Sequence, residues 1–218
     1  DVVDILEPQI SVELIEVIDN KQDFQNILKD KKVSSILIGP GNGINNETKA
    51  RALMALAFID HVVLDADALT VFENNPEELF IDCYPHTILT PHEGEFKKIF
   101  GKEIDEINDR VLKTKEASIK SNTTVVLKGA NTIIASPSGD VVINKSSATY
   151  LATAGSGDVL AGIITSLVGK NKMNAFDAAC AGVWLHSEIG TILGAGMIAE
   201  DIIDLIPVTV KKLLKMHQ

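Results

Sequence analysis

The amino-acid sequence predicts an α/β fold in three layers, with a mostly parallel, doubly wound sheet between two layers of helices. Short runs rich in β-branched residues alternate with longer runs whose apolar residues recur at helical spacing, which is typical of parallel strands joined by helices. The chain has 218 residues, of which 45% are hydrophobic and 23% are charged. That composition suffices for one sizeable core, so we expect a single domain over residues 1–218.

The predicted strands and helices follow one another in a regular order. Apolar runs bounded by turn residues predict strands at 33–38, 61–64, 87–89, 124–127, 132–135 and 141–143. Apolar residues at helical spacing predict helices at 47–59, 94–100, 105–120, 159–168, 175–193 and 198–216. The sequence Ser-Pro-Ser-Gly-Asp at 136–140 predicts a hairpin turn between the last two strands.

The overall charge and the cysteine content narrow the class of protein. The formal net charge is −10 and the pI is near 4.9, whereas proteins that bind nucleic acids or anionic membranes usually present a basic face. No apolar run is long enough to span a bilayer. The two cysteines, Cys83 and Cys180, are too few for a disulfide framework. We therefore expect a cytoplasmic protein that binds neither nucleic acid nor membrane.

The most informative stretch is the glycine-rich turn 155–158, which leads directly into an apolar helical run. Small residues let backbone N–H groups approach a ligand closely, and a helix start adds unpaired N–H groups and the positive end of its dipole. We expect Gly155, Ser156 and Gly157 to hold a phosphate group. Asp158 lies beside them, where a carboxylate can accept the proton of an attacking hydroxyl. The alternative is an ordinary acid at a helix start.

A second candidate segment is Thr-Pro-His-Glu-Gly-Glu-Phe at 90–96, between a predicted strand and a predicted helix. Ligands of open α/β sheets collect at such strand ends. His92 can donate a hydrogen bond to a substrate, and Glu95 can hold Mg²⁺ through water. The alternative is a histidine satisfied by nearby backbone and two acids that favour a helix start.

Three further strand ends carry candidate residues. Gly-Pro-Gly-Asn-Gly at 39–43 suits a tight turn whose N–H groups approach a ligand, although a turn without a ligand has the same composition. Asp65 and Asp67 follow the second strand, where they either bind substrate or Mg²⁺ or cap the next helix. Lys128 leaves a buried strand, where it either meets nucleotide phosphates or points into solvent.

The remaining histidines and the tryptophan lack a spacing typical of ligands. We interpret the histidines as surface or satisfied core residues, namely His61, His86, His186 and His217. We expect Trp184 and Met197 to pack in the interior.

Taken together and in this order, five segments resemble the NAD(P)H-hydrate dehydratase family, over about residues 33–207. The segments are 39–43, 65–69, 90–96, 128–132 and 155–158, and the set is far more specific than any one member. The resemblance implies a ribokinase-like fold and an enzyme that restores NADH or NADPH from its hydrate. It also implies ADP or ATP as phosphoryl donor, with Mg²⁺. We expect a homo-oligomer.

The resemblance also implies roles for individual residues. Gly43 and His92 would contact the hydrated dinucleotide, and we add Gly41, Asp65 and Asp158 as expected substrate contacts. Asp158 would be the catalytic acid/base and Glu95 would have a magnesium-linked role. The nucleotide would be bound by Lys128, Gly129, Ala130, Asn131, Thr132 and Gly157, together with Gly155 and Ser156.

One part of the family pattern has no counterpart here. The family's opening strand and its substrate loop, which contains Gly and Tyr, are not found before Asp1. We therefore expect a precursor segment or an N-terminal partner chain to supply them, or an inactive remnant.

The expected chemistry converts a poor leaving group into a good one. Asp158 accepts the proton of the ring hydroxyl while the N–H groups of 155–158 stabilise the phosphoryl group in transfer. Phosphate then leaves more readily than hydroxide. Two alternatives remain: a small-molecule hydroxyl kinase of the same superfamily, and a non-catalytic nucleotide-binding subunit.

Overall fold

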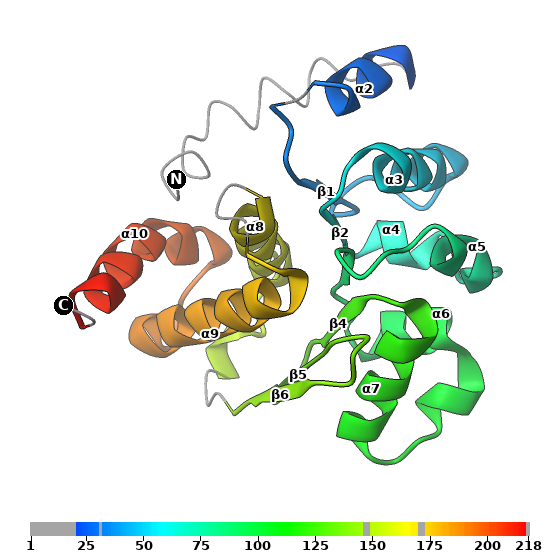
Figure 1. The fold of residues 1–218 in the computed structure, drawn as a ribbon. Helices are drawn as coiled ribbons and strands as arrows, with labels where there is room; N and C mark the ends of the chain where they lie inside the picture. The colour runs from blue at the N-terminus through cyan, green and yellow to red at the C-terminus, as the bar shows by residue number, and fades with distance from the viewer. Residues whose placement is uncertain (1–20, 31, 146–148, 170–172, 217–218) are drawn as a thin grey trace.

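The computed structural model describes residues 21–30, 32–145, 149–169 and 173–216, which form three layers with helices on both faces of one six-stranded sheet (Figure 1). The strands are β1 (Ile36–Ile38), β2 (Val62–Leu64), β3 (Ile88–Leu89), β4 (Thr124–Leu127), β5 (Thr132–Ala135) and β6 (Val141–Asn144). The helices are α2 (Lys21–Leu28), α3 (Asn46–Phe58), α4 (Asp67–Thr70), α5 (Pro76–Ile81), α6 (Glu93–Asp105), α7 (Arg110–Ser121), α8 (Ser156–Gly169), α9 (Ala175–Leu193) and α10 (Ala199–Met216), with a 3-10 turn, η2, at Thr149–Leu151. The predicted three-layer α/β fold is confirmed, but the described strands are added in one direction along the sheet, so the predicted double winding is not found among them.

The strand order is β1-β2-β3-β4-β5-β6, so each strand pairs with the next one in sequence. The pairs from β1 to β4 are parallel, whereas β4, β5 and β6 are antiparallel. In the predicted hairpin turn, the Ser136 N–H donates to the Asp140 carbonyl at 2.9 Å, and the Ser138 hydroxyl donates to the Asp140 carboxylate at 2.9 Å. The hairpin prediction is therefore confirmed.

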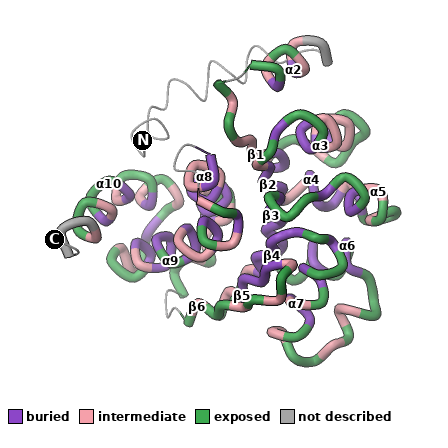
Figure 2. The backbone as a smooth tube through the Cα atoms, in the orientation of Figure 1, coloured by how far each residue is buried: buried purple, intermediate pink, exposed green. Residues whose placement is uncertain are grey.

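The two faces of the sheet bury different cores, because side chains alternate along a strand. Val62 and Leu64 pack with the layer that contains α3 to α7, whereas Val63 packs with α8 and α9. Strands that are added in one direction through right-handed crossovers keep all their crossover helices on one face. The other face is covered by the C-terminal helices. Figure 2 shows the buried strands β2, β3 and β4 between helices whose outer surfaces are exposed, with β6 largely exposed at the edge of the sheet.

The strands and long helices lie within a few residues of their predicted bounds, with one late start and three omitted helices. The helix predicted from residue 105 begins at Arg110, because Asp109 caps it by accepting hydrogen bonds from the N–H groups of Val111 and Leu112 at 2.8 and 3.3 Å. The prediction missed α2 before β1, and α4 and α5 between β2 and β3. Helices of one or two turns hold too few residues for an apolar period to show.

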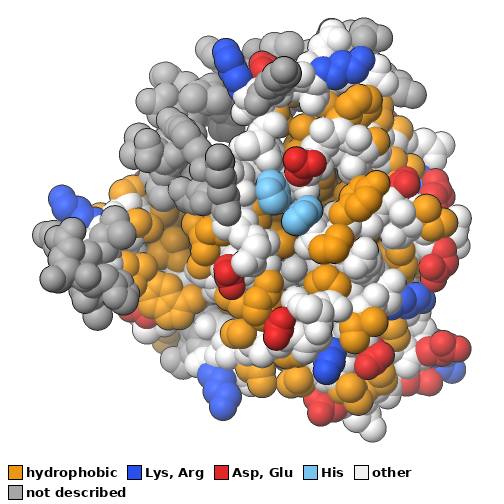
Figure 3. All heavy atoms as spheres, in the orientation of Figure 1, with side chains coloured by type: hydrophobic (Ala, Val, Ile, Leu, Met, Phe, Trp, Pro, Cys, Tyr) orange, Lys and Arg blue, Asp and Glu red, His pale blue; other side chains and the backbone are white. Residues whose placement is uncertain are grey.

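The surface differs from the prediction at one aromatic residue. Met197 is buried as expected, but Trp184 is 41% exposed, so its assignment to the interior was wrong. His217 lies outside the described residues. Among the described helices, none has the length and apolarity that crossing a bilayer requires. On the face drawn in Figure 3, the Lys and Arg side chains of the described residues lie apart, among acidic and apolar ones.

Candidate active site

The carboxyl ends of β1 to β4 lie along one edge of the sheet, because these four strands are parallel. Each is followed at once by one of the segments predicted to bind a ligand: 39–43, 65–69, 90–96 and 128–132. The start of α8 lies beside the same edge, since a Cβ at Gly157 would be 3.4 Å from Lys128 Nζ. The fold therefore brings all five segments together.

The turn after β1 packs so closely against the end of β2 that only glycine fits. A Cβ at Gly39 would lie 1.7 Å from the carbonyl oxygen of Asp65, and Gly39 has a φ of +134°. The Gly39 N–H donates to Asn42 Oδ1 at 2.7 Å, and the Gly43 N–H donates to Asp67 Oδ2 at 2.8 Å. These contacts fix the glycine turn onto the acidic segment after β2.

His92 caps the helix α6. Its Nδ1 accepts hydrogen bonds from the N–H groups of Gly94 at 2.9 Å and Glu95 at 3.3 Å, and the Glu95 carboxylate accepts the His92 N–H at 2.9 Å. Because Nδ1 accepts, the neutral ring carries its proton on Nε2, which is 3.2 Å from Glu95 Oε1. The His92 side chain is 59% exposed. The same ring therefore caps α6 and faces solvent.

Lys128 and Asp65 form an ion pair between two strand ends. Lys128 Nζ lies 2.6 Å from Asp65 Oδ1, and the two side chains are 18% and 1% exposed. Asp65 Oδ2 is buried and has no hydrogen-bond partner among the described residues. The ammonium group is thus held between β2 and the first turn of α8.

The start of α8 is tied to α9 by a buried histidine. Gly155 has a φ of +81° just before the helix, and Ser156 is buried. The hydroxyl and the carbonyl oxygen of Ser156 each lie 3.0 Å from His186 Nε2. Burial lowers the pKa of His186 to about 4, so the neutral ring can donate its Nε2–H to Ser156 at pH 7.

Asp158 lies in the first turn of α8 and is exposed. Partial burial raises the pKa of its carboxyl, and Asp65 raises it further; Lys128 lowers it, and Asp67 again raises it. Those three charged residues follow β2 and β4, so Asp158 faces the strand ends. A carboxylate whose pKa is raised toward neutrality is a better proton acceptor.

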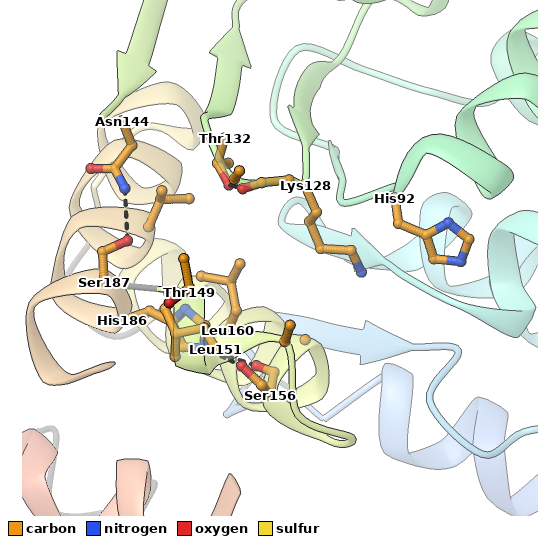
Figure 4. A pocket seen from close by; sticks show the side chains of 15 residues that line it. His92, Lys128, Thr132, Asn144, Thr149, Leu151, Ser156, Leu160, His186 and Ser187 are labelled. Carbon is orange, nitrogen blue, oxygen red and sulfur yellow. Dashed lines mark hydrogen bonds between the residues drawn. The ribbon is translucent and has the colours of Figure 1, made fainter. Parts of the chain in front are cut away.

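A pocket of about 530 Å³ opens between the strand ends and the helices α8 and α9 (Figure 4). Pockets of this volume accommodate small molecules and cofactors. One part of the wall is apolar, with Leu151, Leu160 and Val183, and another is polar, where Asn144 Nδ2 donates to Ser187 Oγ at 2.6 Å. The full lining is His92, Lys128, Gly129, Ala130, Thr132, Asn144, Thr149, Leu151, Ala152, Ser156, Gly157, Leu160, Val183, His186 and Ser187.

The pocket collects many of the residues predicted to bind the nucleotide, but not all of them. Six of the eight line it: Lys128, Gly129, Ala130, Thr132, Ser156 and Gly157. Asn131 and Gly155 stand next to lining residues. Of the expected substrate contacts His92 lines the pocket, whereas Gly41, Gly43, Asp65 and Asp158 belong to the neighbouring strand ends and helix start.

Sequence reasoning did not single out the wall formed by η2, β6 and α9. His186 had been interpreted only as a surface or satisfied core residue; it is buried and hydrogen-bonded, and it also lines the pocket. One signal was available. His186 and Ser187 are polar residues on the buried side of an otherwise apolar helix, at helical spacing from Val183 and Gly190.

The turn between β4 and β5 is held in place by Arg110. Its Nη1 donates to the carbonyl oxygen of Asn131 at 2.8 Å, and its Nε donates to Glu93 Oε1 at 2.7 Å. Lys113 Nζ donates to the other oxygen of Glu93 at 2.7 Å. The Glu93 carboxylate, next to His92, therefore holds Arg110, and Arg110 fixes the turn that carries Gly129 on the pocket wall.

The described part of the chain contains no group of three or more His, Cys, Asp or Glu side chains arranged to hold a metal ion. Glu95, expected to have a magnesium-linked role, uses both carboxylate oxygens on His92 and is 8% exposed. A divalent ion at this edge would therefore take most of its ligands from phosphate oxygens and water.

Comparison with known proteins gives matches over most of the chain. A family model described as NAD(P)H-hydrate dehydratase matches residues 3–207. The ADP-dependent (S)-NAD(P)H-hydrate dehydratase of Neisseria meningitidis is 35% identical over 190 residues, which is 81% of this chain and 63% of that protein. The chain thus spans less than two thirds of the length of this relative.

Solved structures match the fold. The ADP/ATP-dependent NAD(P)H-hydrate dehydratase of Bacillus subtilis, co-crystallised with ATP and Mg²⁺, is 27% identical with a TM-score of 0.70, covering 88% of this chain and 72% of that one. A ribokinase-like superfamily protein of Enterococcus faecalis is 26% identical with a TM-score of 0.73, covering 86% and 66%.

Proposed function

Because the chain belongs to the NAD(P)H-hydrate dehydratase family and has a ribokinase-like fold, we propose that it restores NADH and NADPH from their hydrates. ADP or ATP would supply the phosphoryl group. The single observation that carries this proposal is the pocket, whose walls hold Lys128, Gly157 and the β4–β5 turn, with Asp158 next to it on α8. A nucleotide site beside a proton acceptor is what phosphoryl transfer requires.

The pocket suits an adenine nucleotide in shape and charge. The apolar side chains of Leu151, Leu160 and Val183 offer a surface for a base. The Lys128 ammonium group and the positive end of the α8 dipole supply positive charge for phosphates. We propose that Gly129, Ala130, Asn131 and Thr132 bind the nucleotide from the turn, and that Gly155, Ser156 and Gly157 bind its phosphates.

The hydrate would bind at the neighbouring strand ends. Gly41 is exposed, and a Cβ added to it would have no atom within 4 Å. The exposed His92 ring can contact a substrate as well as cap α6. We place Gly41, Gly43 and His92 in the substrate site. The ring hydroxyl of the hydrate would then lie between Asp158 and the phosphates.

The reaction follows from this placement in two steps. Asp158 accepts the proton of the hydroxyl, whose oxygen forms a bond to the terminal phosphorus while the bond from that phosphorus to the nucleotide breaks. The lone pair of the ring nitrogen then expels phosphate, and loss of a proton from the adjacent ring carbon restores the double bond. Lys128 and the N–H groups of α8 stabilise the negative charge on the phosphoryl oxygens.

A magnesium ion bound with the nucleotide would neutralise part of the phosphate charge. The chain's contribution would be Glu95, acting through water because His92 engages both of its carboxylate oxygens.

The test is an assay of hydrated NADH with purified protein, Mg²⁺ and either ADP or ATP. Recovery of the NADH absorbance, dependent on nucleotide, is the expected result. A stable phosphorylated product without NADH would favour a hydroxyl kinase instead. Nucleotide binding without conversion of the hydrate would favour a non-catalytic subunit.

We also infer the setting in which the protein works. Cys83 and Cys180 are free thiols, which supports a reducing cytoplasm.

We infer a homo-oligomer, because large apolar side chains on α9, α10 and the turn between them are exposed: Trp184, Ile192, Ile198, Ile203 and Val208. Light scattering behind size-exclusion chromatography measures the mass. All the described strands belong to one six-stranded sheet, which supports the proposal of one domain.

A further inference from the structure

We propose that Asp65 is a positioning residue, which holds the Lys128 ammonium group at the start of α8 for the phosphoryl group in transfer. The inference rests on the proposed function and deepens it. It gives Asp65 a role different from the direct substrate contact expected from the sequence.

The burial of Asp65 argues for an indirect role. The residue is 0% exposed, and its N–H donates to the Ile38 carbonyl at 3.1 Å. Its own carbonyl lies against the Gly39 turn, where no Cβ would fit. Oδ1 is taken by Lys128, and Oδ2 is buried. A substrate therefore finds no accessible atom of Asp65 in this arrangement.

Lys128 stands on the boundary between the buried acid and the pocket. Its backbone N–H donates to the Pro91 carbonyl at 2.9 Å, so the end of β4 is fixed next to the His92 segment. Its side chain lines the pocket, and Nζ lies 3.4 Å from the position of a Cβ on Gly157. Figure 4 shows the Lys128 chain extending from the strand end into this space.

The ion pair reduces the freedom of a long side chain. An unpaired lysine loses much rotamer entropy when it settles on a ligand, whereas Lys128 is already held at 2.6 Å from Asp65. An ammonium group has three N–H donors. One serves Asp65, and the others are left for phosphate oxygens. Asp65 therefore holds the Lys128 ammonium group in position before a ligand binds, without contacting the ligand itself.

Asp65 and Lys128 also act in opposite directions on the general base. The charged groups that face Asp158 are Asp65 and Asp67, which raise the pKa of its carboxyl, and Lys128, which lowers it. Removal of Asp65 should therefore lower the pKa of Asp158, and removal of Lys128 should raise it. The acid limb of the pH profile of kcat should shift in opposite directions in the two variants.

The experiment is a double-mutant cycle on the full chain, with Asp65→Asn, Lys128→Met and the double variant. We expect each single change to lower kcat about 10-fold to 100-fold, and the double variant to be no worse than Lys128→Met alone, because Asp65 acts through Lys128. If the two losses multiply, the positioning role is overturned. Nucleotide KM should rise mainly in Lys128→Met.

The pH profile of kcat supplies a readout that a merely structural role would not move. In Asp65→Asn the acid limb should shift to lower pH, and in Lys128→Met to higher pH. Unchanged limbs in both variants would contradict the inference. The matched control is the surface pair of Lys120 with Glu77, 3.1 Å apart, because Lys120→Met removes an equivalent charge from the far end of α7 and should leave both readouts unchanged.

Calorimetric titration with ADP separates this inference from the proposed function. If the wild-type protein binds ADP but does not convert the hydrate, the proposed function fails. The positioning role can still be tested, because Asp65→Asn should change the ADP affinity of the wild-type protein. It should leave the ADP affinity of Lys128→Met unchanged. Equal effects of Asp65→Asn in both backgrounds would overturn the positioning role.

Thermal unfolding adds a check. Lys128→Met leaves the buried Asp65 carboxylate unpaired and should lower Tm, and adding Asp65→Asn to it should restore Tm.

Discussion

Polar side chains are buried at both ends of β4, but only one end satisfies all of them. At the amino end, the Ser118 hydroxyl donates to the Thr123 and Ala135 carbonyls, and Ser121 is bonded to Thr123 at 2.7 Å. At the carboxyl end, Lys128 meets an acid whose second oxygen has no partner among the described residues. The same strand therefore ends in a closed network on one side and an open one on the other.

The difference also extends to the backbone at the carboxyl edge. Gly39 and Gly155 have positive φ, and Ala66 adopts a φ of +47°, which alanine rarely accepts. Asn122, before β4, also has a positive φ, +54°, but asparagine tolerates this conformation at the end of a helix, here α7. Unsatisfied groups and strained backbone cost stability and cluster where ligands bind, whereas satisfied networks rigidify a fold. One buried atom at the amino edge is also without a partner among the described residues, His61 Nδ1 just before β2. The contrast therefore holds for the two ends of β4, of which the amino end serves stability and the carboxyl end serves chemistry.

The largest expected effect is the loss of turnover in Asp158→Asn. The amide cannot accept the hydroxyl proton, so kcat for the dehydration of hydrated NADH should fall about 10²-fold to 10⁴-fold, while ADP affinity stays near that of the wild type. Asp177→Asn removes the acid from the first turn of α9 and is the matched control. An Asp158→Asn variant with normal turnover would rule out the assigned role.

The next effect concerns the strained backbone. Gly39→Ala forces a Cβ to within 1.7 Å of the Asp65 carbonyl at a φ of +134°, and should lower the free energy of unfolding by about 4 kcal/mol or more. Gly41→Ala has a φ of +69° but open space, so about 1 kcal/mol is expected. Urea denaturation of the two variants measures the contrast, and similar losses would mean that the close approach costs nothing.

A pH effect of intermediate size should come from His186. Its folded-state pKa is lowered from 6.5 to about 4 by burial, so the unfolded chain takes up a proton first as the pH falls. The stabilisation is present above pH 6.5 and is lost on the way to pH 4, by at most about 3 kcal/mol. His186→Gln should remove that part of the slope of unfolding free energy against pH. Parallel slopes for both proteins would contradict it.

The smallest effect belongs to the amino edge. Ser118→Ala leaves the Thr123 and Ala135 carbonyls without their hydroxyl donor, which should cost about 2 kcal/mol in unfolding free energy and leave kcat unchanged. Ser138→Ala, in the exposed hairpin turn, should stay within about 0.5 kcal/mol of the wild type. A change in kcat for Ser118→Ala would blur the division between the two edges.

Local pattern was enough to predict most of the fold. The bounds of β4, β5 and α9 agree with the predicted ones, because buried strands and a long apolar helix have strong periods. The family predicted from five segments is confirmed. These features depend on residues that are close together in the sequence.

What the sequence could not predict are contacts between distant residues. Lys128 meets Asp65 across 63 positions, and His186 meets Ser156 across 30. No local signal states that Asp65 is buried beneath a lysine rather than open to substrate. The pocket wall on α9 was missed for the same reason, since His186 shows its second role only when the helix is packed against α8.

The sequential strand order has a consequence for the newly made chain. Each strand can join its predecessor as it leaves the ribosome, because its partner has already been synthesised. The apolar side chains of Val63, Ile88, Val126 and Ile134, however, wait for α8 and α9 to cover them, and α9 is complete only at Leu193. For most of its synthesis the polypeptide therefore carries an uncovered apolar sheet surface, and such surfaces make partly folded chains prone to aggregation.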